Sequence, residues 1–127
     1  METNKHKTGM EGQKEAENFL QAKGYQILTK NYRTKTGEID LIAKNIQAEN
    51  YIIFIEVKYR RGLRHGLPRE AVGKTKQRNI VKTALHYISA NSLDDYDFRF
   101  DVVEILEQNG TFYANHIENA FDASVSF

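Results

Sequence analysis

The chain has 127 residues, of which 40% are hydrophobic and 28% charged, and its formal net charge is +1. This length suits one ordinary domain, and the composition excludes a disordered tail or a fibre. No apolar run approaches the roughly 18 residues of a membrane helix. The first ten residues are polar and there is no cysteine. We therefore expect no secretory signal, no disulfide and no thiol or zinc-thiolate chemistry, and a cytoplasmic protein without membrane contact.

The predicted elements begin with a helix over residues 9–23, where an apolar stripe has helical spacing and Gly24 stands at a position typical of a helix end. A second helix is predicted from Pro68 to about residue 90, and Gly73 is a position where this helix could be interrupted. Three strands are expected between the helices and two after them, at residues 25–32, 37–44, 51–59, 98–106 and 111–117.

This order of helix, three strands, helix and two strands predicts an α/β fold in which residues 1–127 form a single domain. The breaks between the first three strands are short and polar, which is typical of antiparallel connections. Asn109-Gly110 predicts a hairpin turn between the last two strands.

Charged side chains end two of the predicted strands. Glu56 and Lys58 share one face of the strand at 51–59, which is otherwise apolar. Charges at the end of a buried strand are costly unless they are paired, bound to a metal ion or exposed to a cleft. Glu38 and Asp40 share one face of the preceding strand. Both strands therefore carry candidates for a functional site.

A hairpin across residues 45–50 pairs residues whose numbers sum to about 96, so that Asp40 faces Glu56 and Glu38 faces Lys58. Opposed side chains lie roughly 4.5–5.5 Å apart at Cβ, and two carboxylates at that separation repel each other. Mg²⁺ would balance them, because it takes one or two carboxylates, keeps several waters and accepts phosphate oxygens. The alternative is a pair of surface ion pairs, Glu38 with Lys58 and Asp40 with an arginine.

These residues resemble a known nuclease motif. Asp40, followed after about fifteen residues by Glu56-Val57-Lys58, is similar to the PD-(D/E)XK motif of restriction-endonuclease-like proteins and Holliday junction resolvases. The wider sequence resembles the YraN-like family of small bacterial proteins assigned to that fold. The similar blocks cover nearly the whole chain and lie at residues 37–43, 56–60, 68–72, 76–77, 99–103 and 119–121.

The resemblance implies a restriction-endonuclease-like mixed β-sheet flanked by helices, and a metal-dependent nuclease. Asp40 and Glu56 would be the ligands of Mg²⁺ or Mn²⁺, and Lys58 would be the catalytic lysine. The family usually has Gly-Glu near the start of the first helix, where this chain has Gly12-Gln13. Glu17, on roughly the same helix face one turn later, and Glu38, on the acidic strand face, are the candidates to replace that acid. The accessory site residues are therefore predicted to be Glu38, Gln13 and Gln77.

Basic residues gather just after the acidic pair. Between residues 58 and 82 nine residues are basic and one is acidic, whereas residues 91–127 hold eight acids and one arginine. Such asymmetry suits a protein that offers one face to a polyanion, although a solvated helix face is the alternative for any charge run. Contacts with nucleic-acid phosphates are expected from Arg60, Arg61, Arg64, Lys74, Lys76 and Arg78.

Two hypotheses of function follow. The first is a Mg²⁺- or Mn²⁺-dependent endonuclease-like enzyme that binds nucleic acid and hydrolyses DNA phosphodiester bonds, in branched or otherwise structured DNA. The second is a non-catalytic nucleic-acid-binding module of the same fold, which Gln13 favours. A protein–protein adaptor is a third reading, and it leaves the opposed carboxylates unexplained. A homodimer also stays open, because resolvase-like relatives are often dimers.

Overall fold

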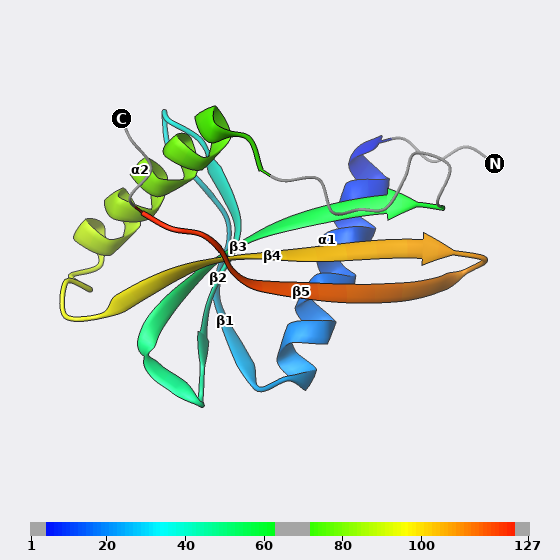
Figure 1. Cartoon of the computed structure of the whole chain (residues 1–127), viewed down its shortest axis with the longest axis horizontal. Helices are drawn as coiled ribbons and strands as arrows, with labels where there is room; N and C mark the ends of the chain where they lie inside the picture. Colours follow the sequence, from blue (N-terminus) through cyan, green and yellow to red (C-terminus); the bar gives the residue numbers. More distant parts are fainter. Residues whose placement is uncertain (1–4, 63–71, 124–127) are drawn as a thin grey trace.

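The fold is a five-stranded sheet with one helix on each face (Figure 1). The computed structural model describes residues 5–62 and 72–123, with side chains from residue 11 onward. The predicted α/β class and the order of elements are confirmed. The elements are α1 (Lys5–Ala22), β1 (Tyr25–Arg33), β2 (Glu38–Asn45), β3 (Ala48–Arg61), α2 (Lys74–Ala90), β4 (Asp97–Gln108) and β5 (Thr111–Phe121).

Some element ends differ from the predictions. α1 begins at Lys5 rather than at residue 9. β3 begins at Ala48, because a tight turn at Ile46 and Gln47 replaces the longer connection expected there. Because of this tight turn, β3 is longer than the sequence pattern indicated.

Among the helices that the structure describes, none has both the length and the apolar character needed to cross a membrane.

The strands lie in the order β1-β2-β3-β4-β5, and only β3 and β4 run parallel. Parallel neighbours need a crossover connection, and α2 lies within it. α2 starts at Lys74 with Gly73 as its N-cap, where the sequence suggested a break. The predicted helix start at Pro68 lies outside the described residues. This crossover places α2 against the sheet face that carries Ile39, Phe54 and Phe100.

The hairpin predicted at Asn109-Gly110 is confirmed. Both residues have positive φ, 54° and 78°, as a two-residue type I′ turn requires. Gln108 and Thr111, which flank the turn, are paired across β4 and β5. Asparagine and glycine tolerate this backbone conformation better than other residues, so the turn fixes the register of the two strands.

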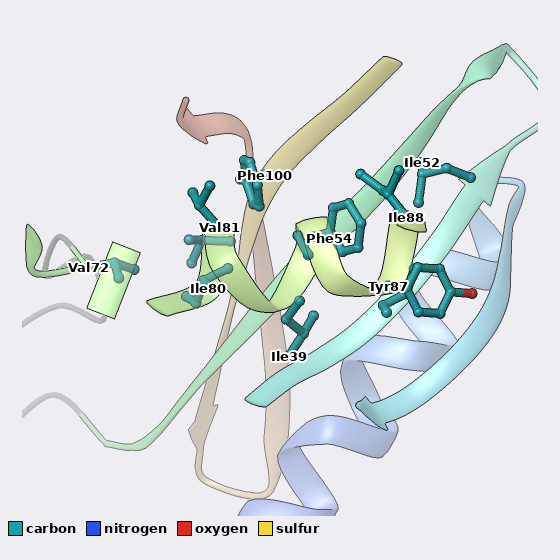
Figure 2. Close-up of a cluster of buried hydrophobic side chains, with 12 residues drawn as sticks. Ile39, Ile52, Phe54, Val72, Ile80, Val81, Tyr87, Ile88 and Phe100 are labelled. Carbon is teal, nitrogen blue, oxygen red and sulfur yellow. The ribbon is translucent and has the colours of Figure 1, made fainter. Parts of the chain in front are cut away.

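Two hydrophobic clusters cover the two faces of the sheet. Figure 2 shows the cluster beneath α2, where Phe54 and Phe100 of the sheet pack with Val81 of the helix. The rings of Phe54 and Phe100 are stacked with centroids 5.6 Å apart. The cluster beneath α1 is formed by residues such as Leu20 and Ile53. Both sheet faces are therefore covered, which explains the continuous apolar run in the middle of β3.

Gly12 allows α1 to approach β3 closely. A Cβ atom added at Gly12 would lie 2.7 Å from the Cβ, Cγ and Cδ1 atoms of Tyr59. Real Cβ atoms do not approach other carbons so closely, so any larger residue would push α1 away from the sheet. The glycine of the Gly12-Gln13 block thus has a packing reason that is independent of any catalytic role.

A buried polar network connects β1, β4 and β5. The carboxylate of Asp101 accepts hydrogen bonds from Arg99 (2.8 and 2.9 Å), His116 Nε2 (2.7 Å) and the amide of Asn119 (2.9 Å). Arg99 also donates to the hydroxyl of Tyr25 (3.0 Å). Burial acts to raise the pKa of Asp101, but the hydrogen bonds from His116 and Arg99 hold it below its ordinary value. The network stabilises the ionised carboxylate inside the fold.

Candidate functional site

Asp40 and Glu56 meet where β2 and β3 separate. Next to the turn Asn45 pairs with Ala48, and after a register shift between Ala43 and Asn45 the two strands follow the predicted register as far as the pair Leu41 and Ile55. Beyond that pair, the Oδ2 atom of Asp40 accepts a hydrogen bond from the amide of Val57 (2.7 Å). Glu56 lines the same pocket as Asp40 and lies close enough for its charge to raise the pKa of Asp40. The acidic side chain therefore replaces the main chain as the partner of β3 at this point.

The rest of the predicted pairing is wrong. Glu38 does not lie opposite Lys58; it pairs with Arg33 of β1 at 3.2 Å. In a regular strand Ile39 and Leu41 would share the face opposite Glu38 and Asp40. They do not, since Ile39 belongs to the cluster beneath α2 and Leu41 to the cluster beneath α1. The two-residue alternation of β2 is thus interrupted at the position between them, where the side-chain hydrogen bond to β3 forms.

A pocket of about 340 Å³ contains the acidic pair. Its walls come from the β1–β2 turn, β2, β3 and α2. Figure 1 shows α2 on one side of the sheet, close to the β1–β2 turn. The lining residues are Thr36, Gly37, Glu38, Asp40, Glu56, Lys76, Asn79 and Ile80. We call this cavity the acidic pocket.

The acidic pocket is short of positive charge. Burial, followed by the charge of Glu56, raises the pKa of Asp40 from 3.8 to about 7. The hydrogen bond from the amide of Val57 opposes this rise but does not cancel it. Glu56 itself is only 7% exposed. Asp40 is half-buried beside it. Two neighbouring carboxylates with so little exposure to water cannot both ionise cheaply without a cation beside them.

Lys76 supplies part of that positive charge. Its ammonium group forms an ion pair with Oε2 of Glu56. Burial acts to lower the pKa of Lys76, but the hydrogen bond and charge of Glu56, and the charge of Asp40, raise it above its ordinary value. Lys76 of α2 thus neutralises the carboxylate of Glu56, whereas the pKa of Asp40 remains raised.

The donor set fits a divalent cation. Within residues 5–62 and 72–123, no group of three or more His, Asp or Glu side chains is placed to hold a metal ion. Two carboxylates are nevertheless enough for Mg²⁺, which often takes one or two from a protein and completes its shell with water and phosphate. The raised pKa of Asp40 is the electrostatic condition that such a cation would relieve. Asp40 and Glu56 are the residues that would hold it.

Lys58 lies on β3 two residues beyond Glu56 and is half-buried. Its neighbour on β4 is Glu104, which is 3% exposed. One oxygen of Glu104 accepts a hydrogen bond from Asn115 (2.9 Å), whereas Oε2 has no hydrogen-bond partner. The sequence analysis missed Glu104, because only the parallel pairing of β3 and β4 brings it beside Lys58.

Of the three predicted accessory residues, Glu38 lines the acidic pocket with the pair, whereas Gln77 and Gln13 are not among its lining residues. Gln77 donates from Nε2 to the carbonyl oxygen of Val72 (2.6 Å), so it holds the start of α2. Gln13 is half-buried on α1, the helix that covers the opposite sheet face. Glu17, one turn later, pairs with Lys30 of β1 at 3.5 Å. Glu17 is therefore engaged with β1 and is not among the residues that line the acidic pocket.

The predicted phosphate-binding residues are spread along β3 and α2. Arg61 is paired with Glu107 (3.3 Å), and Arg78 donates to the hydroxyl of Thr75 (3.3 Å). Lys74 is exposed at the start of α2, and Lys76 faces the acidic pocket. Arg60 is half-buried at the end of β3. Arg64 lies outside the described residues.

One face of α2 carries further pocket residues that the sequence analysis did not select. Asn79 and Ile80 line the acidic pocket together with Lys76. Thr83 is fully buried and holds the β1–β2 turn through its hydroxyl group. The spacing of three, four and seven residues from Lys76 is the repeat of a single helix face. That repeat is the signal by which these residues could have been found.

The fold and the acidic pair define an α/β protein with a candidate site at the point where two strands diverge. The sequence model described as "Uncharacterised protein family UPF0102" matches residues 12–105. A UPF0102 protein of Clostridium acetobutylicum is 47% identical over 117 residues, covering 91% of this chain and 93% of the relative. A UPF0102 protein of Caldanaerobacter subterraneus subsp. tengcongensis is 46% identical over 121 residues, covering 93% and 97%. The chain belongs to the UPF0102 family, which confirms the predicted YraN-like family.

Proposed function

We propose that the protein is a Mg²⁺- or Mn²⁺-dependent phosphodiesterase that binds nucleic acid and hydrolyses DNA, in branched or otherwise structured substrates. The observation that carries this proposal is the contact between Asp40 and Glu56 in the acidic pocket, where the pKa of Asp40 is raised to about 7. A structural ion pair would be expected to lower the pKa of its carboxyl group. An acidic pair that is largely shielded from water and has excess negative charge is instead typical of a cation-binding site.

Asp40 and Glu56 are the proposed ligands of the ion. A divalent cation bound there supplies Lewis-acid activation of a phosphate and of a water molecule. The amide of Val57 fixes Oδ2 of Asp40, so the orientation of this carboxylate is set before any ligand arrives. Such preorganisation lowers the cost of assembling the site.

The two lysines have separate proposed roles. Lys58 is placed beyond Glu56 on the same strand and would stabilise negative charge on the reacting phosphate. Lys76 balances Glu56 when no other cation is present. When the carboxylate of Glu56 is engaged elsewhere, the ammonium group of Lys76 is left at the pocket wall as a donor to phosphate oxygens.

A second candidate function is a nucleic-acid-binding module of the same fold that does not cut. The specific observation in its favour is the ion pair between Lys76 and Glu56, which already neutralises one of the two carboxylates. Gln13, in place of the acid usual in the family, points the same way. In this case the acidic pocket would be a structural charge cluster, and only the basic residues would contact the ligand.

Cleavage assays and calorimetry separate the two functions. Wild type, Asp40→Asn and the control Glu49→Gln, an exposed residue of β3, are incubated with linear, single-stranded, flapped and four-way DNA, with Mn²⁺ or with chelator. We expect Mn²⁺-dependent cleavage by wild type and Glu49→Gln only, and Mn²⁺ binding by calorimetry that Asp40→Asn loses. Binding of DNA in chelator, with neither cleavage nor Mn²⁺ binding, would establish the non-catalytic module.

A further inference from the structure

A second pocket lies beside the acidic pocket, on the other side of the β1–β2 turn. Its volume is about 460 Å³, and Thr36 lines both cavities, so the turn forms the wall between them. The turn reaches α2 in Figure 1, and hydroxyl contacts to Thr83 confirm that approach. We call this cavity the basic pocket; it is lined by Arg33, Thr34, Lys35, Thr36, Lys82 and His86.

The two pockets have opposite charge. The described lining of the basic pocket has three permanent cations and an imidazole and contains no acid, whereas the acidic pocket contains three carboxylates. Glu38 lies at the boundary, where it pairs with Arg33 at 3.2 Å. The side chain of Lys35 is exposed at the tip of the turn. An anion that extends from one pocket to the other would therefore find cationic donors immediately next to the acidic pair.

The wall between the pockets is held rigidly. The amide of Thr34 donates to the carbonyl oxygen of Gly37 (2.8 Å), which closes the turn. The hydroxyl groups of Thr34 and Thr36 lie 2.8 Å apart, and each contacts the hydroxyl group of Thr83, at 3.2 and 3.1 Å. Thr83 in turn donates to the carbonyl oxygen of Asn79 (2.8 Å). The turn is thus fixed to α2 without any ligand, and a ligand would not need to order it.

The opposite wall has a fixed imidazole. The hydroxyl group of Tyr32 and Nδ1 of His86 form a short hydrogen bond. When the hydroxyl group donates to Nδ1, the neutral ring carries its proton on Nε2, which is then a donor. Lys82, one turn earlier on α2, lies on the same helix face as His86. These groups are donors to anionic oxygens, which matches the chemistry of a phosphodiester.

We propose that the basic pocket is a subsite for the nucleic-acid backbone, in which a phosphate flanking the scissile one is held by Arg33, Lys35 and Lys82. This inference rests on the proposed function of the acidic pocket. The ligand is a continuous strand rather than a free phosphate, because the two pockets share Thr36 and oppose each other in charge. Contacts of this kind place the strand without reading its sequence.

The first test measures DNA affinity in chelator, so that no cleavage is needed. Lys35→Gln is compared with Lys14→Gln, which removes one exposed lysine from α1 on the opposite sheet face. For a short duplex, losing one phosphate contact should flatten the slope of log K against log salt by about 0.9 and weaken binding roughly tenfold at about 50 mM salt. Lys14→Gln should leave the slope unchanged. Equal effects of the two variants would overturn the subsite.

The second test separates a strand from a small anion. The amide signals of Thr34 and Thr36 and the ring signals of His86 are followed by NMR during titration with the duplex or with inorganic phosphate. We expect the duplex to shift them at concentrations where phosphate has no effect. Saturation by phosphate with no response to the duplex would make the pocket a small-anion site and overturn the proposal. Duplex binding here without any Mn²⁺-dependent cleavage would refute the nuclease function but keep the subsite.

Discussion

Replacing Asp40 by asparagine tests the electrostatics of the acidic pocket directly. The amide oxygen of asparagine can still accept the hydrogen bond from Val57, while the charge that opposes Glu56 is removed. The pKa of Asp40 is about 7 in the folded protein, against about 3.9 in an unfolded chain. Three pKa units at about 1.4 kcal/mol each correspond to a change in the free energy of unfolding of about 4 kcal/mol.

The sign of the effect follows from proton binding. Because the folded state holds the Asp40 proton more tightly than the unfolded state does, this group favours folding fully below about pH 4, and that contribution is lost as the pH rises to about 7. Asp40→Asn does not titrate at this position. Its free energy of unfolding should therefore equal that of wild type near pH 4 and exceed it by about 4 kcal/mol at pH 8. The difference should grow by about 1.4 kcal/mol per pH unit between about pH 4 and pH 7.

Urea unfolding followed by circular dichroism, in chelator and across this pH range, measures the difference. Glu49→Gln removes an exposed carboxylate from β3 and serves as the matched control, for which we expect a small and constant difference. If Asp40→Asn were less stable than wild type at pH 8, or if its advantage did not vary with pH, then Asp40 would be a satisfied structural partner. The argument for a cation site in the acidic pocket would then fail.

Three further substitutions test other parts of the structure. Gly12→Ala should lose about 1–3 kcal/mol of stability in urea unfolding, despite the better helix propensity of alanine, and an unchanged midpoint would contradict the close approach of α1 to β3. Asp101→Asn should lose about 3–5 kcal/mol at pH 7, because Arg99 and His116 lose their buried partner. Since the lowered pKa of Asp101 stabilises the fold only above the unfolded value of about 3.9, that loss should shrink below about pH 4, and a loss independent of pH would count against it. Lys58→Ala should abolish DNA cleavage but keep a Mn²⁺-induced rise in melting temperature at least as large as that of wild type, and a smaller rise would exclude the proposed role.

The elements were predictable because their signals are local. The Asn109-Gly110 turn, the glycine after α1 and the alternation of the strands depend on residues a few positions apart. The register predicted for the middle of β2 and β3 is confirmed, although the turn is tighter than expected and a register shift between Ala43 and Asn45 compensates for it. That register predicted that Asp40 and Glu56 lie side by side. In the structure both side chains line one pocket, and the charge of Glu56 raises the pKa of Asp40.

The surroundings of the acidic pair could not be predicted in this way. Lys76 reaches Glu56 only through the crossover of α2, whose path depends on the parallel pairing of β3 and β4. Glu104 comes beside Lys58 by the same pairing. Glu38 was placed wrongly because a simple ladder assumes that pairing continues to the strand end, whereas the side chain of Asp40 takes over at that point. Each of these contacts depends on segments far apart in the sequence.

The parallel pairing of β3 with β4 also orders events during folding. Asp40 and Glu56 are joined by a tight hairpin, whereas Lys76 arrives only with the crossover that pairs Tyr51 with Asp97. Long loops close later than short ones, so the two carboxylates should meet before their counter-charge is in place. We expect the carboxylate repulsion to slow refolding at pH 8, and Asp40→Asn to refold faster than wild type at pH 8 but equally fast near pH 4 in stopped-flow measurements. Equal refolding rates at both pH values would mean that the hairpin closes only after the rate-limiting step.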